Sequence, residues 1–226
     1  MRILSTLGVK GVLDVLCPRF EAATGLALDI RYNPTAVLVG EIREGARGDV
    51  ALLTGAGIAE MIAAGILQAG SGVDLARSKV GLAVPAGAPR PAIGSRGEVI
   101  AALLAARCVV YSGSGASGLY FARLLGELGI AAAVNARATI IPAGFTAELL
   151  RDGRGSLAVQ QVSELMAVEG VDVLGPLPAE IQDDLVFSGG VFCSASAHGQ
   201  PASQLLRFIS APEHAALYRA KGLFEI

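Results

Sequence analysis

The chain has 226 residues, 53% of them hydrophobic and 17% charged, and a formal net charge of −2 at pH 7. This size and apolar content suffice for a substantial core in one large or two small domains. The small net charge gives no electrostatic basis for a nucleic-acid partner or an anionic membrane surface. No apolar run reaches the ~18–20 residues of a membrane span, so we expect no membrane insertion.

The N-terminal residues, Met-Arg-Ile-Leu-Ser-Thr-Leu, lead directly into an expected strand and lack the pattern of a secretion signal. The chain as it stands is therefore expected to be cytoplasmic, or periplasmic if a signal has been removed. Cys17, Cys108 and Cys193 lie far apart in apolar surroundings, which predicts buried free thiols. No Cys/His cluster has metal-ligand spacing, and we expect neither a metal nor a cofactor.

Short apolar runs alternate with amphipathic helical patterns along the chain, which predicts an α/β fold with mostly parallel sheets. Pro18 lies inside the first helical pattern and is expected to kink that helix or displace its last turn. Strands are expected at residues 2–5, 27–32, 50–53, 80–84, 108–111, 138–141, 157–160 and 185–192, and helices at 10–23, 36–44, 57–64, 98–106, 118–128, 146–151, 201–209 and 212–221.

Two breaks rich in proline and glycine, at residues 84–91 and 175–178, enclose a block about the size of a small domain. The chain then returns with a long strand and two terminal helices. We therefore predict one lobe made of residues 1–80 and 181–226 and a second lobe made of residues 81–180. A domain that is interrupted by another in this way leaves a cleft between two lobes.

A run of serines and glycines, residues 112–118, connects an apolar strand to an amphipathic helix. Hydroxyls, bare backbone N–H groups and the positive end of the helix dipole together favour a small anion. The same run contains G-x-G-x-x-G at Gly113, Gly115 and Gly118, the spacing of a dinucleotide-binding loop. That motif requires an acidic residue ~20 residues later at the end of the next strand. Here that strand is followed by Pro-Ala-Gly, so we reject the dinucleotide.

From end to end the chain resembles the periplasmic molybdate-binding protein family. The resemblance implies a two-lobe type II periplasmic-binding-protein fold with two crossover strands, and an oxyanion held at helix N-termini between the lobes. It is carried by the opening strand and helix at residues 3–13, F-E-A-A-T-G at 20–25, R-G-D-V at 47–50, A-A-G-I-L at 63–67 and A-K-G-L-F at 220–224.

The resemblance also implies which residues hold the ligand. Two of the family's serine positions fall at Gly8 and Thr35, its small-residue–glycine pair at Ser117-Gly118, and its tyrosine at Gln160. The full expected ligand-binding set is Thr6, Leu7, Gly8, Lys10, Asn33, Thr35, Ser112, Ser114, Ser117, Gly118, Phe145 and Gln160.

Two departures from the family pattern bear on the ligand. Glycine replaces the first serine, and glutamine replaces the tyrosine. The loop at residues 112–118 is also richer in serine than a tetrahedral oxyanion requires. We therefore expect a small oxyanion or organic carboxylate other than molybdate, delivered to an ABC permease if the protein is exported.

An enzymatic alternative stays open, because aconitate isomerases resemble the same family. Their reaction is an allylic proton shift, which needs a proton-transfer group and donors for the carboxylates. Tyr111, Glu164 and His198 are the candidates for proton transfer, and Lys10 is a further available group at the first turn of helix one. The hydroxyls and N–H groups of residues 112–118 could hold the carboxylates. Each of these residues also has an ordinary structural explanation, such as a helix cap or a solvated surface position.

Overall fold

The computed structural model describes residues 1–195 and 199–226. The chain divides into two compact units, unit 1 with Met1–Ser78 and Leu185–Ile226, and unit 2 with Lys79–Asp184. It passes from one unit to the other inside strand β4 (Val73–Pro85) and again at the beginning of β9 (Asp184–Val191). The proline-rich residues 84–91 lie wholly within unit 2.

The sheet of unit 1 is built around three parallel strands. β1 (Arg2–Ser5) pairs in parallel with β2 (Asp29–Tyr32) on one side and with β3 (Val50–Thr54) on the other. β9 then pairs antiparallel with β3 and is followed in the sheet by β4. All five residues of β3 are buried, as expected for the central strand of a sheet with helices on both faces.

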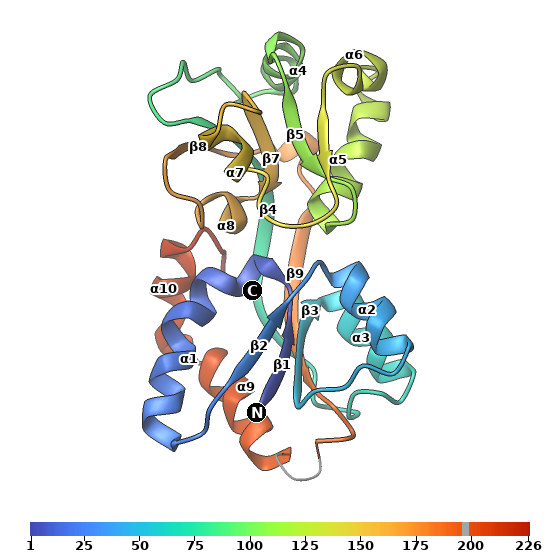
Figure 1. Cartoon of the computed structure of the whole chain (residues 1–226), viewed down its shortest axis with the longest axis vertical. Coiled ribbons are helices and arrows are strands. Elements are labelled where there is room, and N and C mark those ends of the chain that lie inside the picture. The colour runs from blue at the N-terminus through green and yellow to red at the C-terminus, as the bar shows by residue number, and fades with distance from the viewer. Residues whose placement is uncertain (196–198) are drawn as a thin grey trace. The chain divides into compact units, whose positions relative to one another are not determined.

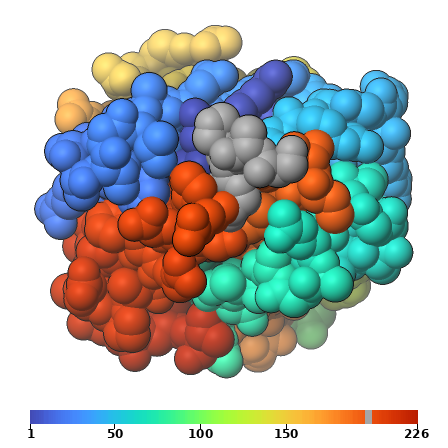
Figure 2. Space-filling view, turned by 90° about the horizontal axis from the view of Figure 1, so that it is seen from below, coloured from blue at the N-terminus to red at the C-terminus, as the bar shows by residue number. Residues whose placement is uncertain are grey.

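Helices cover both faces of this sheet, with α1 and α9 on one side and α2 and α3 on the other (Figure 1). The C-terminal segment lies against α1, as Figure 2 shows in orange-red beside blue, and the rings of Phe20 and Phe208 are 5.6 Å apart. The helices of unit 1 are α1 (Lys10–Thr24), α2 (Thr35–Arg43), α3 (Gly55–Ala63), α9 (Gly199–Ile209) and α10 (Ala215–Ala220), with 3-10 helices at Leu7–Val9 and Pro212–His214.

Helix α1 continues through Pro18 to Thr24 and ends at Gly25, whose φ of 72° is left-handed. The predicted displacement of its last turn is therefore wrong. Proline removes one N–H donor, whereas Leu16, Cys17 and Phe20 on either side of it are buried in the core of unit 1. Burial of that apolar stripe outweighs the loss of one backbone hydrogen bond.

Unit 2 has a second set of three parallel strands. β5 (Val109–Ser112) lies between β6 (Thr139–Ile141) and β7 (Leu157–Gln161), and both pair with it in parallel. The unit 2 part of β4 pairs antiparallel with β7 and with β8 (Val171–Pro176). The helices of unit 2 are α4 (Arg96–Ala105), α5 (Ala116–Glu127), α6 (Ala131–Asn135), α7 (Glu148–Arg151) and α8 (Val162–Leu165), with a 3-10 helix at Ala179–Ile181.

The structure corrects several sequence-based predictions. β4 begins seven residues earlier than predicted. Its first half was not recognised because Asp74, Arg77 and Lys79 interrupt the pattern of apolar residues. The short elements β8, α6 and α8 were not predicted at all. Cys193, which we expected to be buried, is exposed in the turn after β9, whereas Cys17 and Cys108 are buried. Among the described residues, every helix falls short of the length and hydrophobicity that crossing a bilayer requires.

Helix α5 approaches β5 so closely that only glycine fits at position 118. A Cβ atom on Gly118 would lie 1.7 Å from the carbonyl oxygen of Ser112, well inside any allowed contact. The contact is with backbone, which cannot swing aside as a side chain can. Gly118 therefore sets the distance between the N-terminus of α5 and the end of β5.

We expect the substitution Gly118→Ala to lower the free energy of unfolding by about 3 kcal/mol, because a methyl group forces α5 away from β5. The matched control is Gly126→Ala in the same helix, where a Cβ meets nothing within 4 Å. The Gly126→Ala change should raise the free energy of unfolding by about 0.5 kcal/mol, since alanine favours the helix. Urea denaturation of both variants measures the two effects, and equal values would contradict the packing argument.

Candidate functional site

The carboxyl ends of the parallel strands in unit 1 form one continuous edge. The backbone N–H of Thr6 donates to Leu52 O at 2.8 Å, and that of Asn33 donates to Ser5 O at 3.1 Å. The N–H of Thr54 donates to the hydroxyl of Thr35 at 3.3 Å. Three chain segments are thereby held side by side, and we call them the unit-1 edge: residues 6–10, 33–35 and 54–57.

Position 8 contributes only backbone to this edge. Gly8 is buried, and a Cβ atom there would lie 2.2 Å from the Phe187 ring of β9. The phenylalanine ring thus fills the space into which a side chain at position 8 would project. Leu7, the preceding residue, is half-buried. A side chain at position 8 would therefore require the Phe187 ring to move.

Lys10 forms an ion pair with Asp14 in the same helix. Its Nζ atom lies 2.8 and 2.7 Å from the two carboxylate oxygens of Asp14, and 5.2 Å from the centre of the Tyr32 ring. The side-chain amide of Asn33 lies 3.5 Å from the Glu41 carboxylate. The remaining donors of the unit-1 edge are neutral hydroxyls and backbone N–H groups.

The carboxyl ends of β5, β6 and β7 form a second continuous edge in unit 2. The Ser112 hydroxyl accepts hydrogen bonds from the N–H groups of Ser114 at 3.3 Å and Gly115 at 2.9 Å. The Ser114 hydroxyl in turn donates to Pro142 O, and Gly113 N donates to Ile141 O at 2.8 Å. We call residues 112–118, 142–146 and 160–164 the unit-2 edge.

Gln160 holds the middle segment of the unit-2 edge. Its Oε1 atom accepts from the N–H of Thr146 at 2.8 Å and from the Thr146 hydroxyl at 3.0 Å, and its Nε2 donates to Gly144 O at 3.0 Å. Gln160 and Thr146 are both buried, and Phe145 between these contacts is half-buried. The Gln160 amide therefore positions the loop after β6.

The helical segments at the predicted ligand positions begin without a cap from a side chain. The helical segments that begin at Leu7, Thr35 and Ala116 receive no N-cap side-chain hydrogen bond from the described residues. Side-chain caps are also absent at α1, α6, α7 and α10, whereas Thr54 caps α3, Ser95 caps α4, and Gln161 forms a capping box in α8. First-turn N–H groups that lack an internal partner are ready donors to an anion.

The end of β7 carries a nearly buried acid. The Glu164 carboxylate accepts from the N–H of Gln161 at 3.3 Å, and the Gln161 side chain accepts from the Glu164 N–H, which forms a capping box. Burial raises the pKa of Glu164 to about 7, although the hydrogen bonds from Gln161 and Gln160 act in the opposite direction. Glu164 is therefore able to exchange a proton near neutral pH.

Beside Glu164, the buried hydroxyl of Ser163 has no hydrogen-bond partner within residues 1–195 and 199–226. Buried polar atoms are normally paired, so an orphan at this position favours an external partner. Sequence reasoning missed Ser163, Thr54 and Thr146 as members of the two edges. A signal was available, because all three lie within a few residues of a predicted strand end or loop.

The other two candidates for proton transfer differ from Glu164. The Tyr111 hydroxyl donates to Asn135 at 2.8 Å, and its ring packs edge-on against Phe121 in the core of unit 2. Burial raises the pKa of Tyr111 above its usual value. His198 lies outside the described residues. Of the three, Glu164 alone is observed on an edge that also carries predicted ligand residues.

Comparison with known proteins gives a consistent result. The family profile described as bacterial extracellular solute-binding protein matches residues 1–224. A protein named aconitate isomerase from a Pseudomonas species is 32% identical over 99% of this chain and 87% of its own length. Among solved structures, the periplasmic molybdate-binding protein of Azotobacter vinelandii aligns with a TM-score of 0.83 at 18% identity, covering 100% of this chain and 99% of its own.

A sulfate-binding protein from Mycobacterium tuberculosis aligns with a TM-score of 0.72 at 17% identity, over 99% of this chain and 85% of its own. Both solved structures have the type II periplasmic-binding fold, and the predicted fold class is confirmed. The predicted resemblance to the molybdate-binding family is confirmed as well.

The raised pKa of Glu164 predicts a pH-dependent stability. Between pH 4.5, its ordinary pKa, and about pH 7, the folded protein keeps a proton that the unfolded chain has lost. The stabilising contribution of this proton is complete below pH 4.5. It decreases by about 1.4 kcal/mol per pH unit across this window and is lost once the pH has risen through 7.

Glu164→Gln keeps the capping acceptor and removes the titration. Its melting temperature relative to wild type should therefore rise from pH 4.5 to pH 7 and then level off, as measured by circular dichroism. Glu169→Gln, at an exposed position, is the control, and its melting temperature should follow that of wild type at every pH. A constant difference between Glu164→Gln and wild type would contradict the assignment.

Proposed function

This chain belongs to the bacterial extracellular solute-binding protein family, and we propose that it binds a small oxyanion, specifically an organic carboxylate. The observation that carries the proposal is that each unit has helical N-termini without side-chain caps within the described chain, at Leu7 and Thr35 in unit 1 and at Ala116 in unit 2. Each follows the carboxyl end of a parallel strand. Helix N-termini bind anions through backbone N–H groups and the positive end of the dipole.

The donors around these N-termini suit a carboxylate that is bound without a full counter-charge. Thr6, Thr35 and Ser117 offer hydroxyls, and the ammonium group of Lys10 on the unit-1 edge already contacts Asp14. The orphan hydroxyl of Ser163 adds a buried donor in unit 2. Hydrogen bonds to a charged acceptor are stronger than neutral ones, so several neutral donors suffice for one carboxylate group.

Two observations favour an organic carboxylate over molybdate or sulfate. Phe187 fills the space next to Gly8, which makes that part of the unit-1 edge apolar. The relative at 32% identity is named for aconitate, a tricarboxylate, whereas the molybdate- and sulfate-binding proteins share only the fold at 17–18% identity. In a transport role, the loaded protein would deliver this anion to an ABC permease.

Binding is tested with a panel of tricarballylate, trans-aconitate, citrate, molybdate and sulfate. We expect the polycarboxylates to raise the melting temperature in proportion to the logarithm of their concentration, and molybdate and sulfate to have little effect. Isothermal titration of the Ser117→Glu variant should show at least a tenfold loss of affinity, because a like charge then occupies the N-terminus of α5.

The control is Leu119→Glu, which adds the same charge two residues later at an exposed position. It should bind nearly as well as wild type, and circular dichroism should confirm that both variants are folded. Equal affinity of the two variants would remove the N-terminus of α5 from the site. Stabilisation by none of the five anions would overturn the proposed function.

A second candidate function, isomerisation of an unsaturated polycarboxylate, is favoured by the pKa of Glu164 and by the relative named aconitate isomerase. In this reaction the Glu164 carboxylate would remove a proton from the methylene carbon of trans-aconitate. The double bond would shift by one position, and the carboxylic acid would return the proton to the far end of the former double bond. An acid with a pKa near 7 serves in both directions.

Proton NMR of trans-aconitate incubated with the protein follows this reaction directly. If the protein is an isomerase, new vinyl signals appear and Glu164→Gln lowers the rate by about 10²–10⁴-fold while binding persists. Glu169→Gln, at an exposed position outside the two edges, is the matched control and should leave the rate unchanged. If trans-aconitate binds and its NMR spectrum stays unchanged over hours, the protein is not an isomerase of this substrate and acts as a solute-binding protein.

A further inference from the structure

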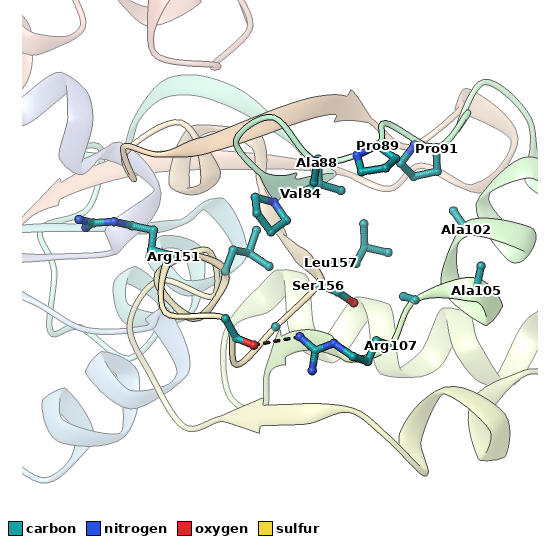
Figure 3. Close-up of a pocket in the computed structure, with 15 residues that line it drawn as sticks. Val84, Ala88, Pro89, Pro91, Ala102, Ala105, Arg107, Arg151, Ser156 and Leu157 are labelled. Carbon is teal, nitrogen blue, oxygen red and sulfur yellow. Dashed lines mark hydrogen bonds between the residues drawn. The ribbon is translucent and has the colours of Figure 1, made fainter.

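Unit 2 contains a hollow (Figure 3) at the beginning of β7, the opposite end of this strand from the unit-2 edge. Its volume is about 550 Å³, within the range of small-molecule sites. It lies where β7 begins, at Ser156 and Leu157, and where β4 ends, at Val84. With about 3.3 Å of rise per residue, Leu157 and Gln161 are about 13 Å apart along the strand. The hollow is therefore separate from the proposed anion site.

The walls of the hollow are aliphatic. Val84 and Leu157 come from the sheet, Pro89 and Pro91 from the loop after β4, and Ala105 from α4, as Figure 3 shows. The alanines of α4 leave room that larger residues on the same helix would occupy. An apolar chain that enters this space removes both its own surface and that of the walls from water.

The charged groups of the hollow are all positive. Arg107 and Arg151 line it, and none of its described lining residues is acidic. Arg107 lies at the rim, where its Nη2 donates to Gly153 O at 2.9 Å. A guanidinium has five N–H donors, so this bond leaves others for a ligand. In Figure 3 the end of the Arg151 side chain points away from the hollow, which leaves Arg107 as the cation at its rim.

We propose that this hollow binds an aliphatic monocarboxylate of medium chain length. The chain lies between Leu157 and the prolines 89 and 91, and the carboxylate pairs with Arg107. One available cation at the rim of an apolar space matches one carboxylate at the end of an apolar chain. The occupant is therefore an anionic amphiphile and differs from the polycarboxylates of the proposed function, which have no apolar chain.

The test separates the contributions of head and tail by titrating the full chain with octanoate, octanol and acetate. We expect octanoate to bind, octanol to bind more weakly and acetate not to bind. Arg107→Gln should lower the affinity for octanoate by about tenfold, because it removes a charge-assisted hydrogen bond to the carboxylate. The affinity for octanol should be unchanged. Arg123→Gln, at an exposed arginine that does not line this hollow, is the matched control and should leave both affinities unchanged.

A second variant, Ala105→Phe, fills the hollow from an exposed position and should abolish both octanoate and octanol binding. Ser117→Glu, which disables the proposed anion site, should leave octanoate binding intact. Loss of octanoate binding in Ser117→Glu would place that ligand at the strand-end site and overturn the proposal. Equal octanoate affinity in wild type, Arg107→Gln and Ala105→Phe would overturn it as well, whatever the polycarboxylate panel shows.

Discussion

Parallel pairing of three strands in each unit is the constraint on which the other features depend. β1 pairs in parallel with β2 and β3, and β5 does so with β6 and β7. Parallel neighbours need a crossover connection, here mostly a helix, so the strands of a set all end at one edge and the following segments begin there. The concentration of hydroxyls and helix N-termini at each edge is a geometric result of that pairing.

Capping then divides these N-termini into two classes. Where Thr54 and Gln161 cap their helices, the orphan N–H groups are satisfied from within the chain. At the N-termini that begin at Thr35 and Ala116 the described chain offers no such cap, which leaves donors for solvent or a ligand. Partial charges at helix ends attract an anion without requiring a full positive charge that must be balanced when no ligand is bound.

The pattern of apolar residues was sufficient to predict the fold class, since buried strands such as β3 are continuous hydrophobic runs. It was insufficient where burial alternates with charge, as in the first half of β4 with Asp74 and Arg77. The sequence also could not show why glycine occupies particular positions. Gly8 leaves room for the Phe187 ring, and Gly118 leaves room for the carbonyl of Ser112. Neither contact follows from spacing in the sequence. The role of Gln160 in holding the loop after β6 was equally hidden.

The route of the chain through β9 has a consequence for the order of folding. Unit 2 is one uninterrupted stretch, whereas unit 1 needs β9 beside β3, and Phe224 paired with Arg77. During synthesis, residues 79–184 are all available before β9 exists, so unit 2 can close its hydrogen bonds while β3 still has an open edge. An unpaired strand edge is the usual starting point for aggregation. β9, in the C-terminal segment Leu185–Ile226, therefore covers the open edge of β3 only after the rest of the chain has been made.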